Sequence, residues 1–137
     1  MSRADYNEDI DNWALIKCRG RVASATRGKR GQAMLKAMLA ALDAMPLKEL
    51  IEGALQEPCG QVCAFGALAQ TRGINVSQID PENARLVAQT FDIAEPLARE
   101  VVYENDEGAW SPHNETPAQR WVRMRAWVER QIIKEPA

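Results

Sequence analysis

The residues best suited to bind a ligand are cations that gather between positions 19 and 32. Backbone N–H groups at the start of a helix bind anions, and neighbouring cations reinforce that binding. The run RGKRGQ at 27–32 precedes or opens an expected helix, but it lacks the GxxxxGK[ST] spacing of a P-loop. We expect a site for an anion or a partner here, with a solvated turn or internal salt bridges as the alternative. Its candidate residues are Arg19, Arg21, Arg27, Lys29, Arg30 and Gln32.

A second group consists of carboxylates between positions 95 and 107. They are expected to form an acidic interaction face made of Glu95, Glu100, Glu104, Asp106 and Glu107. Clustered carboxylates can hold Mg²⁺ or act as acid and base, but the spacing of a calcium loop is absent and no nucleophile stands nearby. The alternative is a hydrated helix end that Gly108 terminates. The segment 85–101 resembles a DNA-reading helix pair in outline, yet its glutamates would repel phosphates.

The tryptophans offer candidate interface residues. Trp121 is expected to face the core from the last helix, whereas Trp127 lies opposite on that helix and Trp110 lies in a loop. One of the last two is expected to be exposed, and an exposed Trp beside arginines suits a protein interface. A Trp that partly covers a small core is the alternative.

The cysteines do not suggest a metal site or a disulfide framework. Cys18, Cys59 and Cys63 are an odd number in a chain without an export signal, so we expect free or buried thiols. The single His113 lies far from them in sequence, and zinc needs four good ligands. We expect no metal, no cofactor and no catalytic residues, and therefore not an enzyme.

Composition places the chain among ordinary soluble domains. Of 137 residues, 46% are hydrophobic and 26% are charged, and the formal net charge is -2. These values exclude composition-driven disorder, and no apolar run reaches the roughly 18 residues that cross a bilayer. The polar start is not a signal peptide, so we expect a cytoplasmic location without membrane contact. The near-zero total hides asymmetry: residues 12–42 hold seven bases and no acid, whereas 77–115 hold nine acids and two bases. These segments either steer a charged partner or pair internally.

The hydrophobic pattern predicts a single all-α domain, 1–137, folded as an orthogonal bundle of about six or seven helices with frayed ends at 1–7 and 134–137. The Gly- and Arg-rich stretch after the first helix is expected to form a loop or a broken helical turn, and Asp80-Pro81-Glu82 is expected to start a later helix. Thr116 and Gln119 fit a capping box, and Gly73 is expected to end the helix at 62–72 as its C-terminal cap. One apolar stripe is expected on the helix at 27–45, formed by Leu35, Met38, Leu39, Leu42 and Met45. A close helix–helix approach is expected at Gly66, and a short strand at 61–65 or a hairpin near 54–65 competes with helix there. The predicted helices span about 8–17, 27–45, 47–56, 62–72, 80–91, 94–105 and 117–133.

Four segments together resemble a family of small proteins encoded by phages and prophages. They are RGKRGQAMLKAMLAALDAMP, GQVCAFGALAQTRG, FDIAEPLAREVVYENDEG and ETPAQRWVRMRAWVERQI, and the pairing of VCAFGAL with YENDEG is the most specific part. The resemblance spans about residues 19–133 and implies a viral or prophage origin and a helical fold. It supplies no catalytic residues. One departure is Asp92, where the family pattern leads us to expect Gly.

The hypothesis favoured by the sequence is a non-enzymatic phage accessory protein that binds a host protein or protein complex. Antagonism of a host defence or nuclease complex is its specific form. The alternative is a nucleic-acid-binding accessory protein that uses the basic 17–36 segment. An enzyme would need a nucleophile–base pair or a metal set that the sequence does not offer. The oligomeric state and the identity of the partner stay open.

Overall fold

The computed structural model of the chain describes residues 12–134 and confirms the all-α prediction. Within that range there are six α-helices, one 3-10 helix at Pro112–Asn114 and no strand. The expected frayed ends fall almost wholly outside the described residues. The α-helices are α1 (Asn12–Arg27), α2 (Lys29–Ala44), α3 (Ala64–Arg72), α4 (Ala84–Phe91), α5 (Glu95–Glu107) and α6 (Pro117–Gln131).

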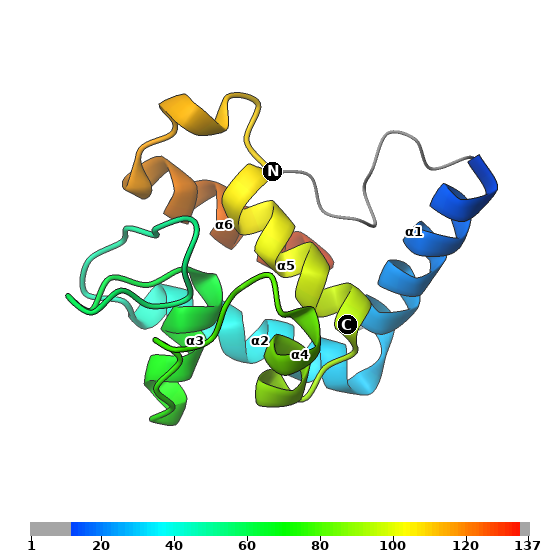
Figure 1. Cartoon of the computed structure of the whole chain (residues 1–137), viewed down its shortest axis with the longest axis horizontal. Helices are drawn as coiled ribbons and strands as arrows, with labels where there is room; N and C mark the ends of the chain where they lie inside the picture. The colour runs from blue at the N-terminus through cyan, green and yellow to red at the C-terminus, as the bar shows by residue number, and fades with distance from the viewer. Residues whose placement is uncertain (1–11, 135–137) are drawn as a thin grey trace.

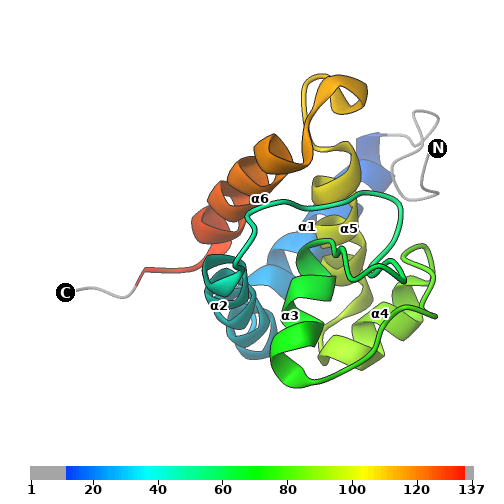
Figure 2. The same ribbon diagram turned by 90° about the vertical axis from the view of Figure 1, so that its left-hand side faces the viewer.

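Five of the helices enclose the core, and α1 extends away from them. Figures 1 and 2 show α2 to α6 crossing in several directions, and in Figure 1 the start of α1 stands apart from the other helices. The apolar stripe of α2, with Met34, Leu35, Met38 and Leu42, is completely buried. Phe65 of α3 stacks on Phe91 of α4 with ring centroids 4.5 Å apart. No helix in the described range is long and apolar enough to cross a membrane.

The helix ends follow the predicted capping chemistry at three places. The Thr116 hydroxyl accepts from the Gln119 N–H at 3.1 Å, and the Gln119 side chain accepts from the Thr116 N–H at 2.9 Å. Gly73 ends α3 with φ 69°, and Gly108 ends α5. Asp92 ends α4 with φ 55° and ψ 54°, a left-handed conformation that suits Gly better.

Two predictions for the first half of the chain are wrong, one of a loop and one of a helix. The Gly- and Arg-rich stretch after residue 18 is not a loop, because α1 continues through it to Arg27. Ala, Arg and Val around Gly20 sustain the helix, and the chain bends only at Gly28.

The helix predicted at 47–56 is also absent. Tertiary bonds hold that backbone instead: the Leu50 N–H donates to the Pro117 carbonyl at 3.0 Å, and the Ile51 N–H donates to the Val62 carbonyl at 3.0 Å. A single antiparallel bridge between Gln56 and Val62 confirms the short hairpin near 54–65. Local helix propensity is overridden here because the segment pairs with distant backbone.

The predicted start of the fourth helix at Asp80 is three residues too early. Asp80 instead forms a turn, in which its carboxylate accepts from the Glu82 N–H at 2.9 Å. Asn83 is the N-cap, and its side chain accepts from the Leu86 N–H at 3.2 Å. Both Asp and Asn suit such positions, so the motif alone did not decide between them.

Candidate interaction surface

Helix α1 packs most closely against the body at its C-terminal end. At its C-terminal end, Gly31 of α2 packs so closely that an added Cβ would lie 2.1 Å from the Ala25 carbonyl oxygen. Towards its N-terminal end the coverage decreases, and Leu15, Cys18 and Val22 are only half-buried on the side that faces the body. The helix therefore packs closely at the bend to α2 and is more exposed along its first turns.

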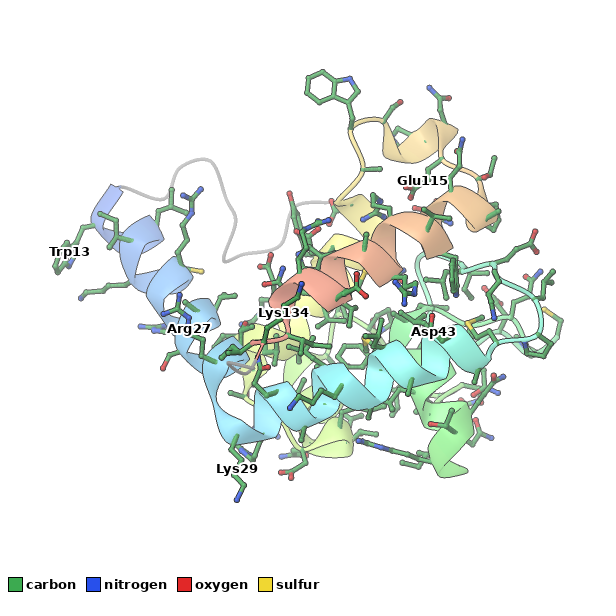
Figure 3. The ribbon with its side chains drawn as sticks, turned by 180° about the vertical axis from the view of Figure 1, so that it is seen from behind. Trp13, Arg27, Lys29, Asp43, Glu115 and Lys134 are labelled. Carbon is green, nitrogen blue, oxygen red and sulfur yellow. The ribbon has the colours of Figure 1, made fainter. Side chains whose placement is uncertain are left out.

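The outer turns of α1 carry exposed apolar side chains. Trp13 is 66% exposed and Ile16 is 61% exposed, one helical turn apart. Figure 3 shows Trp13 at the outer end of α1, pointing away from the body. The Lys17 ammonium lies 5.2 Å from the centre of the Trp13 ring, a cation–π contact. We name this set of Trp13, Ile16 and Lys17 the α1 tip.

The predicted cationic site is divided by the bend between α1 and α2. All five of its cations are exposed, and Arg30 forms an exposed ion pair with Asp92 at 3.2 Å. Two groups emerge: Arg19 and Arg27 line one hollow, Lys29 and Arg30 line another, and Arg21 belongs with the second. The residues of the site thus do not converge on one point.

Gln32 has a different role from the predicted one. Its amide nitrogen donates to the carbonyls of Thr26 at 2.7 Å and Gln131 at 3.0 Å, and its amide oxygen accepts from the Ile133 N–H at 2.9 Å. Gln32 therefore joins α1, α2 and the end of α6, and these internal bonds already use both ends of its amide.

The first hollow is a groove of about 600 Å³ between α1 and the α5–α6 pair. Its apolar lining includes Leu15, Val22, Ile132 and Ile133. Its charged lining comprises Arg19 and Arg27 from α1, Glu100 from α5 and Arg130 from α6. We call this hollow the α1 groove.

The second hollow, of about 500 Å³, lies at the bend between α1 and α2. It is lined by Arg21, Ser24, Lys29 and Arg30, together with Ala94 and Pro96 at the start of α5. Neither α2 nor α5 has a side chain that caps its N-terminus. In Figure 3 Lys29 points outward from this bend. We call this hollow the elbow.

The predicted acidic residues do not share one environment. Burial, with the adjacent Glu100 carboxylate, raises the pKa of the half-buried Glu104. Burial also raises the pKa of Asp106, whose carboxylate accepts from the Asn105 amide at 2.8 Å. Glu95 lies 3.9 Å from Arg99 in an (i, i+4) pair. Part of the predicted acidic face therefore turns inward.

The partly buried Glu104 and Asp106 lie beside a buried polar network that the sequence analysis did not predict. Asn105 is 1% exposed; its amide oxygen accepts from the Ala64 N–H at 3.1 Å, and its amide nitrogen donates to the Ile51 carbonyl at 2.9 Å. Arg123 donates to the carbonyls of Glu104 at 2.6 Å and Asn105 at 3.1 Å, which satisfies the C-terminal end of α5.

Glu115, just before α6, and Arg120, on α6, complete the network. Glu115 accepts two bonds from Arg123, at 2.6 and 3.0 Å. Arg120 is 4% exposed and donates to the Leu50 carbonyl at 2.9 Å. Its Nε lies 3.3 Å from Glu115, an ion pair whose angles do not satisfy a hydrogen bond. Figure 3 shows Glu115 beside the start of α6. We call Asn105, Glu115, Arg120 and Arg123 the polar hub.

The tryptophans separate clearly. Trp110 is fully exposed, which confirms that one of the pair lies at the surface. Trp127 is 9% exposed and packs in the core, which corrects its place among the interface aromatics. Trp121 is half-buried and donates its indole N–H to the Leu42 carbonyl at 3.1 Å. The buried stripe of α6 therefore consists of Met124, Trp127 and Val128 together with Arg120, and Trp121 packs at its edge.

No disulfide joins Cys18, Cys59 and Cys63. Burial raises the pKa of the Cys63 thiol to about 12, so that thiol is a poor nucleophile. Within residues 12–134 no group of three or more His, Cys, Asp or Glu side chains is arranged to hold a metal ion.

Comparison with known proteins gave no match. No protein-family model matches the chain, and neither the curated proteins nor the solved structures searched include a significant relative. The functional argument therefore depends on the geometry of α1 and its surroundings.

Proposed function

We propose that the protein is a non-enzymatic accessory protein that docks onto another protein through helix α1. The α1 tip is the observation that carries this proposal: Trp13 and Ile16 are both more than half exposed, at the end of α1 that lies away from its close packing on Gly31. Exposed aromatic and aliphatic side chains on a projecting element become buried when a partner packs on them, and this burial drives association.

The charge of α1 supports a partner of opposite sign. The helix contains four bases and no acid. Such a helix attracts an acidic surface at long range, and its apolar residues then supply the contact.

The specific form of the proposal comes from the resemblance to phage and prophage proteins. Its host-cell partner would be a protein or protein complex of the defence or nuclease type, which the chain antagonises by occupying its surface. The polarised distribution of charge along the chain supports this form, because proteins that act on nucleic acids present strongly charged surfaces.

A quantitative pull-down with matched variants tests docking through α1. Tagged full-length chain is incubated with host lysate, and retained proteins are compared between wild type, Trp13→Ala/Ile16→Ser and Leu47→Ser/Val122→Ser. Leu47 and Val122 are 64% and 62% exposed, so the control removes a similar apolar exposure elsewhere. We expect a retained partner that the α1 variant loses and the control keeps. Equal retention by both variants would contradict the proposal.

Nucleic-acid binding is the second candidate, and the elbow favours it. Arg21, Lys29 and Arg30 line one hollow at the uncapped start of α2, where backbone N–H groups also favour a phosphate. Such binding should weaken steeply with salt, with a log–log slope near the number of phosphates contacted. Arg21→Glu/Lys29→Glu should abolish it. Failure of labelled DNA and RNA to bind at low ionic strength would exclude this candidate.

A further inference from the structure

The α1 groove shows a continuous surface that the body leaves uncovered. Ile16, Arg19, Ala23 and Arg27 follow one another at helical spacings of three and four residues, so they form one stripe along α1. All four are exposed. The stripe joins the exposed Ile16 of the α1 tip to the groove lined by the other three residues. The α1 tip and the α1 groove are therefore parts of one surface.

The groove has the size and lining of a seat for a chain segment. Its volume of about 600 Å³ lies within the usual range of binding clefts. Leu15 and Val22 on one wall and Ile132 on the other are only half-buried. These apolar side chains gain contacts when an apolar segment lies between the walls.

The charges along the groove define the occupant further. Arg19 and Arg27 on α1 and Arg130 on α6 face the hollow, against the one carboxylate of Glu100. Arginine binds carboxylates in a planar, two-point geometry. Carboxylates spaced along the occupant would thus find cations on both walls.

Resting on the docking function proposed above, we propose that the α1 groove seats an acidic, amphipathic segment of the partner protein, with its carboxylates on Arg19, Arg27 and Arg130 and its apolar side chains against Leu15, Val22 and Ile132.

Glu100 distinguishes this occupant from a nucleic acid. The carboxylate lines the groove, and Glu104 lies next to it on α5. A phosphate backbone carries its charges at regular intervals and would meet these carboxylates. A peptide can place an apolar or basic side chain beside Glu100 and acidic side chains beside the arginines, so each of its charges can lie opposite a groove residue of the opposite sign.

A defined peptide tests the groove directly. The probe is a fluorescein-labelled peptide of about 18 residues, or roughly five turns, with Leu at i, i+3, i+4 and i+7 spacing and with Glu and Ala elsewhere. Its control has the same composition in scrambled order. Fluorescence anisotropy with the full-length chain should show the amphipathic probe binding about tenfold more tightly than the scrambled one. Equal binding of the two peptides would overturn the proposal.

Variants with equal changes of charge locate the site. Arg19→Glu/Arg27→Glu should weaken the amphipathic probe by at least about tenfold, whereas Lys36→Glu/Arg85→Glu, at exposed positions outside the groove, should change affinity by less than about twofold. If both double variants weaken binding equally, only net charge matters and the groove assignment is wrong.

Two further outcomes separate the groove from the docking function. If a labelled single strand of about 15 nucleotides binds more tightly than the probe and loses binding in Arg19→Glu/Arg27→Glu, the groove takes nucleic acid and the proposal is wrong. If Trp13→Ala/Ile16→Ser loses the lysate partner while Arg19→Glu/Arg27→Glu binds the probe as tightly as wild type, docking through α1 is supported and the groove proposal is wrong.

Discussion

Helix α1 and the polar hub represent opposite uses of charged and polar residues. The hub buries Asn105 and Arg120 almost completely and provides partners for nearly all of their polar groups. In α1 the cations are exposed and the apolar side chains lie partly in water. A satisfied buried network fixes one arrangement of the chain, whereas a half-covered helix leaves surface free for a partner. The hub therefore holds the fold, and the exposed surface of α1 is the basis of the proposal that α1 contacts a partner.

The motifs that carry the family resemblance fall mostly on the structural side of this comparison. Asn105 comes from YENDEG, and Glu115, Arg120 and Arg123 come from ETPAQRWVR. The VCAFG run supplies the Ala64 N–H that Asn105 binds. YENDEG, ETPAQRWVR and VCAFG therefore build the contact between α3, α5 and α6. Other parts of the same resembling segments supply Arg27, Glu100 and Arg130 to the α1 groove.

Gly66 and Gly20 test the comparison most strongly, because substitution by Ala should destabilise the protein at Gly66 and stabilise it at Gly20. A Cβ on Gly66 would lie 2.0 Å from the Leu55 carbonyl oxygen and 2.7 Å from the Val62 Cβ. The predicted close approach at Gly66 is thus real, but its partner is the hairpin and not another helix. We expect Gly66→Ala to lower the free energy of unfolding by about 3 kcal/mol or more, measured by urea titration. A loss below about 1 kcal/mol would contradict the close packing.

The next largest effect is expected in the hub. Asn105→Ala removes the partners of the Ala64 N–H and the Ile51 carbonyl, and an unsatisfied buried group costs about 1–3 kcal/mol. We expect the free energy of unfolding to fall by about 2–3 kcal/mol in the same titration. Asn114→Ala, in the exposed 3-10 helix, is the control and should change it by less than about 0.5 kcal/mol.

In α1, the substitution of Gly20 by Ala should stabilise the helix. Gly20 lies inside the helix, and an added Cβ there meets nothing within 4 Å. Ala favours a helix interior over Gly by about 0.5–1 kcal/mol, so Gly20→Ala should raise the helix content and, slightly, the melting temperature. Circular dichroism measures both quantities. A drop in either would show that α1 is packed more tightly than its exposure indicates.

The carboxylate of Glu104 should make the stability of the body depend on pH. Its pKa is raised in the folded chain, so between the usual value and the raised one the folded state binds more protons than the unfolded state. Stability from this group therefore falls as pH rises through that window. Glu104→Gln should make the variant relatively more stable as pH rises, by comparison of urea titrations between about pH 4 and 8. A difference that is the same at every pH would contradict this origin.

The smallest effect on stability is expected at the α1 tip. Trp13→Ala/Ile16→Ser removes side chains that are mostly in water, and such surface changes stay within about 0.5 kcal/mol. Urea titration should give an unchanged free energy of unfolding, while binding in the pull-down is lost. A clear destabilisation would show that these residues already pack inside the molecule.

Periodicity and capping predicted the helices whose stabilising contacts are local. The stripe of α2, the box at Thr116 and the stop at Gly73 could all be read directly. The segment 47–56 could not, because its backbone pairs with residues such as Pro117 and Asn105 that are distant in sequence. Local propensity contains no information on those pairs.

The hub escaped prediction because its charged residues look like surface residues. Arg120, Met124, Trp127 and Val128 are the buried residues of α6, at spacings of four, three and one. An arginine on the helix face that buries Met124 and Trp127 was the available signal, because a buried cation requires buried partners. Of the predicted cationic site, the exposure of Arg19 and Arg27 was foreseeable from their types, but their separation from the elbow depends on the bend at Gly28.

Hydrogen exchange along the full-length chain tests the central comparison most directly. The account predicts that amides in the first turns of α1 exchange by local opening, far faster than those of α3 and α5, and that adding the amphipathic probe peptide slows exchange along the α1 groove, in α1 and at the end of α6. Equal protection of α1 and α5 in the free chain, or exchange in α1 that the probe leaves unchanged, would contradict the claim that α1 is a partly exposed helix that binds a partner.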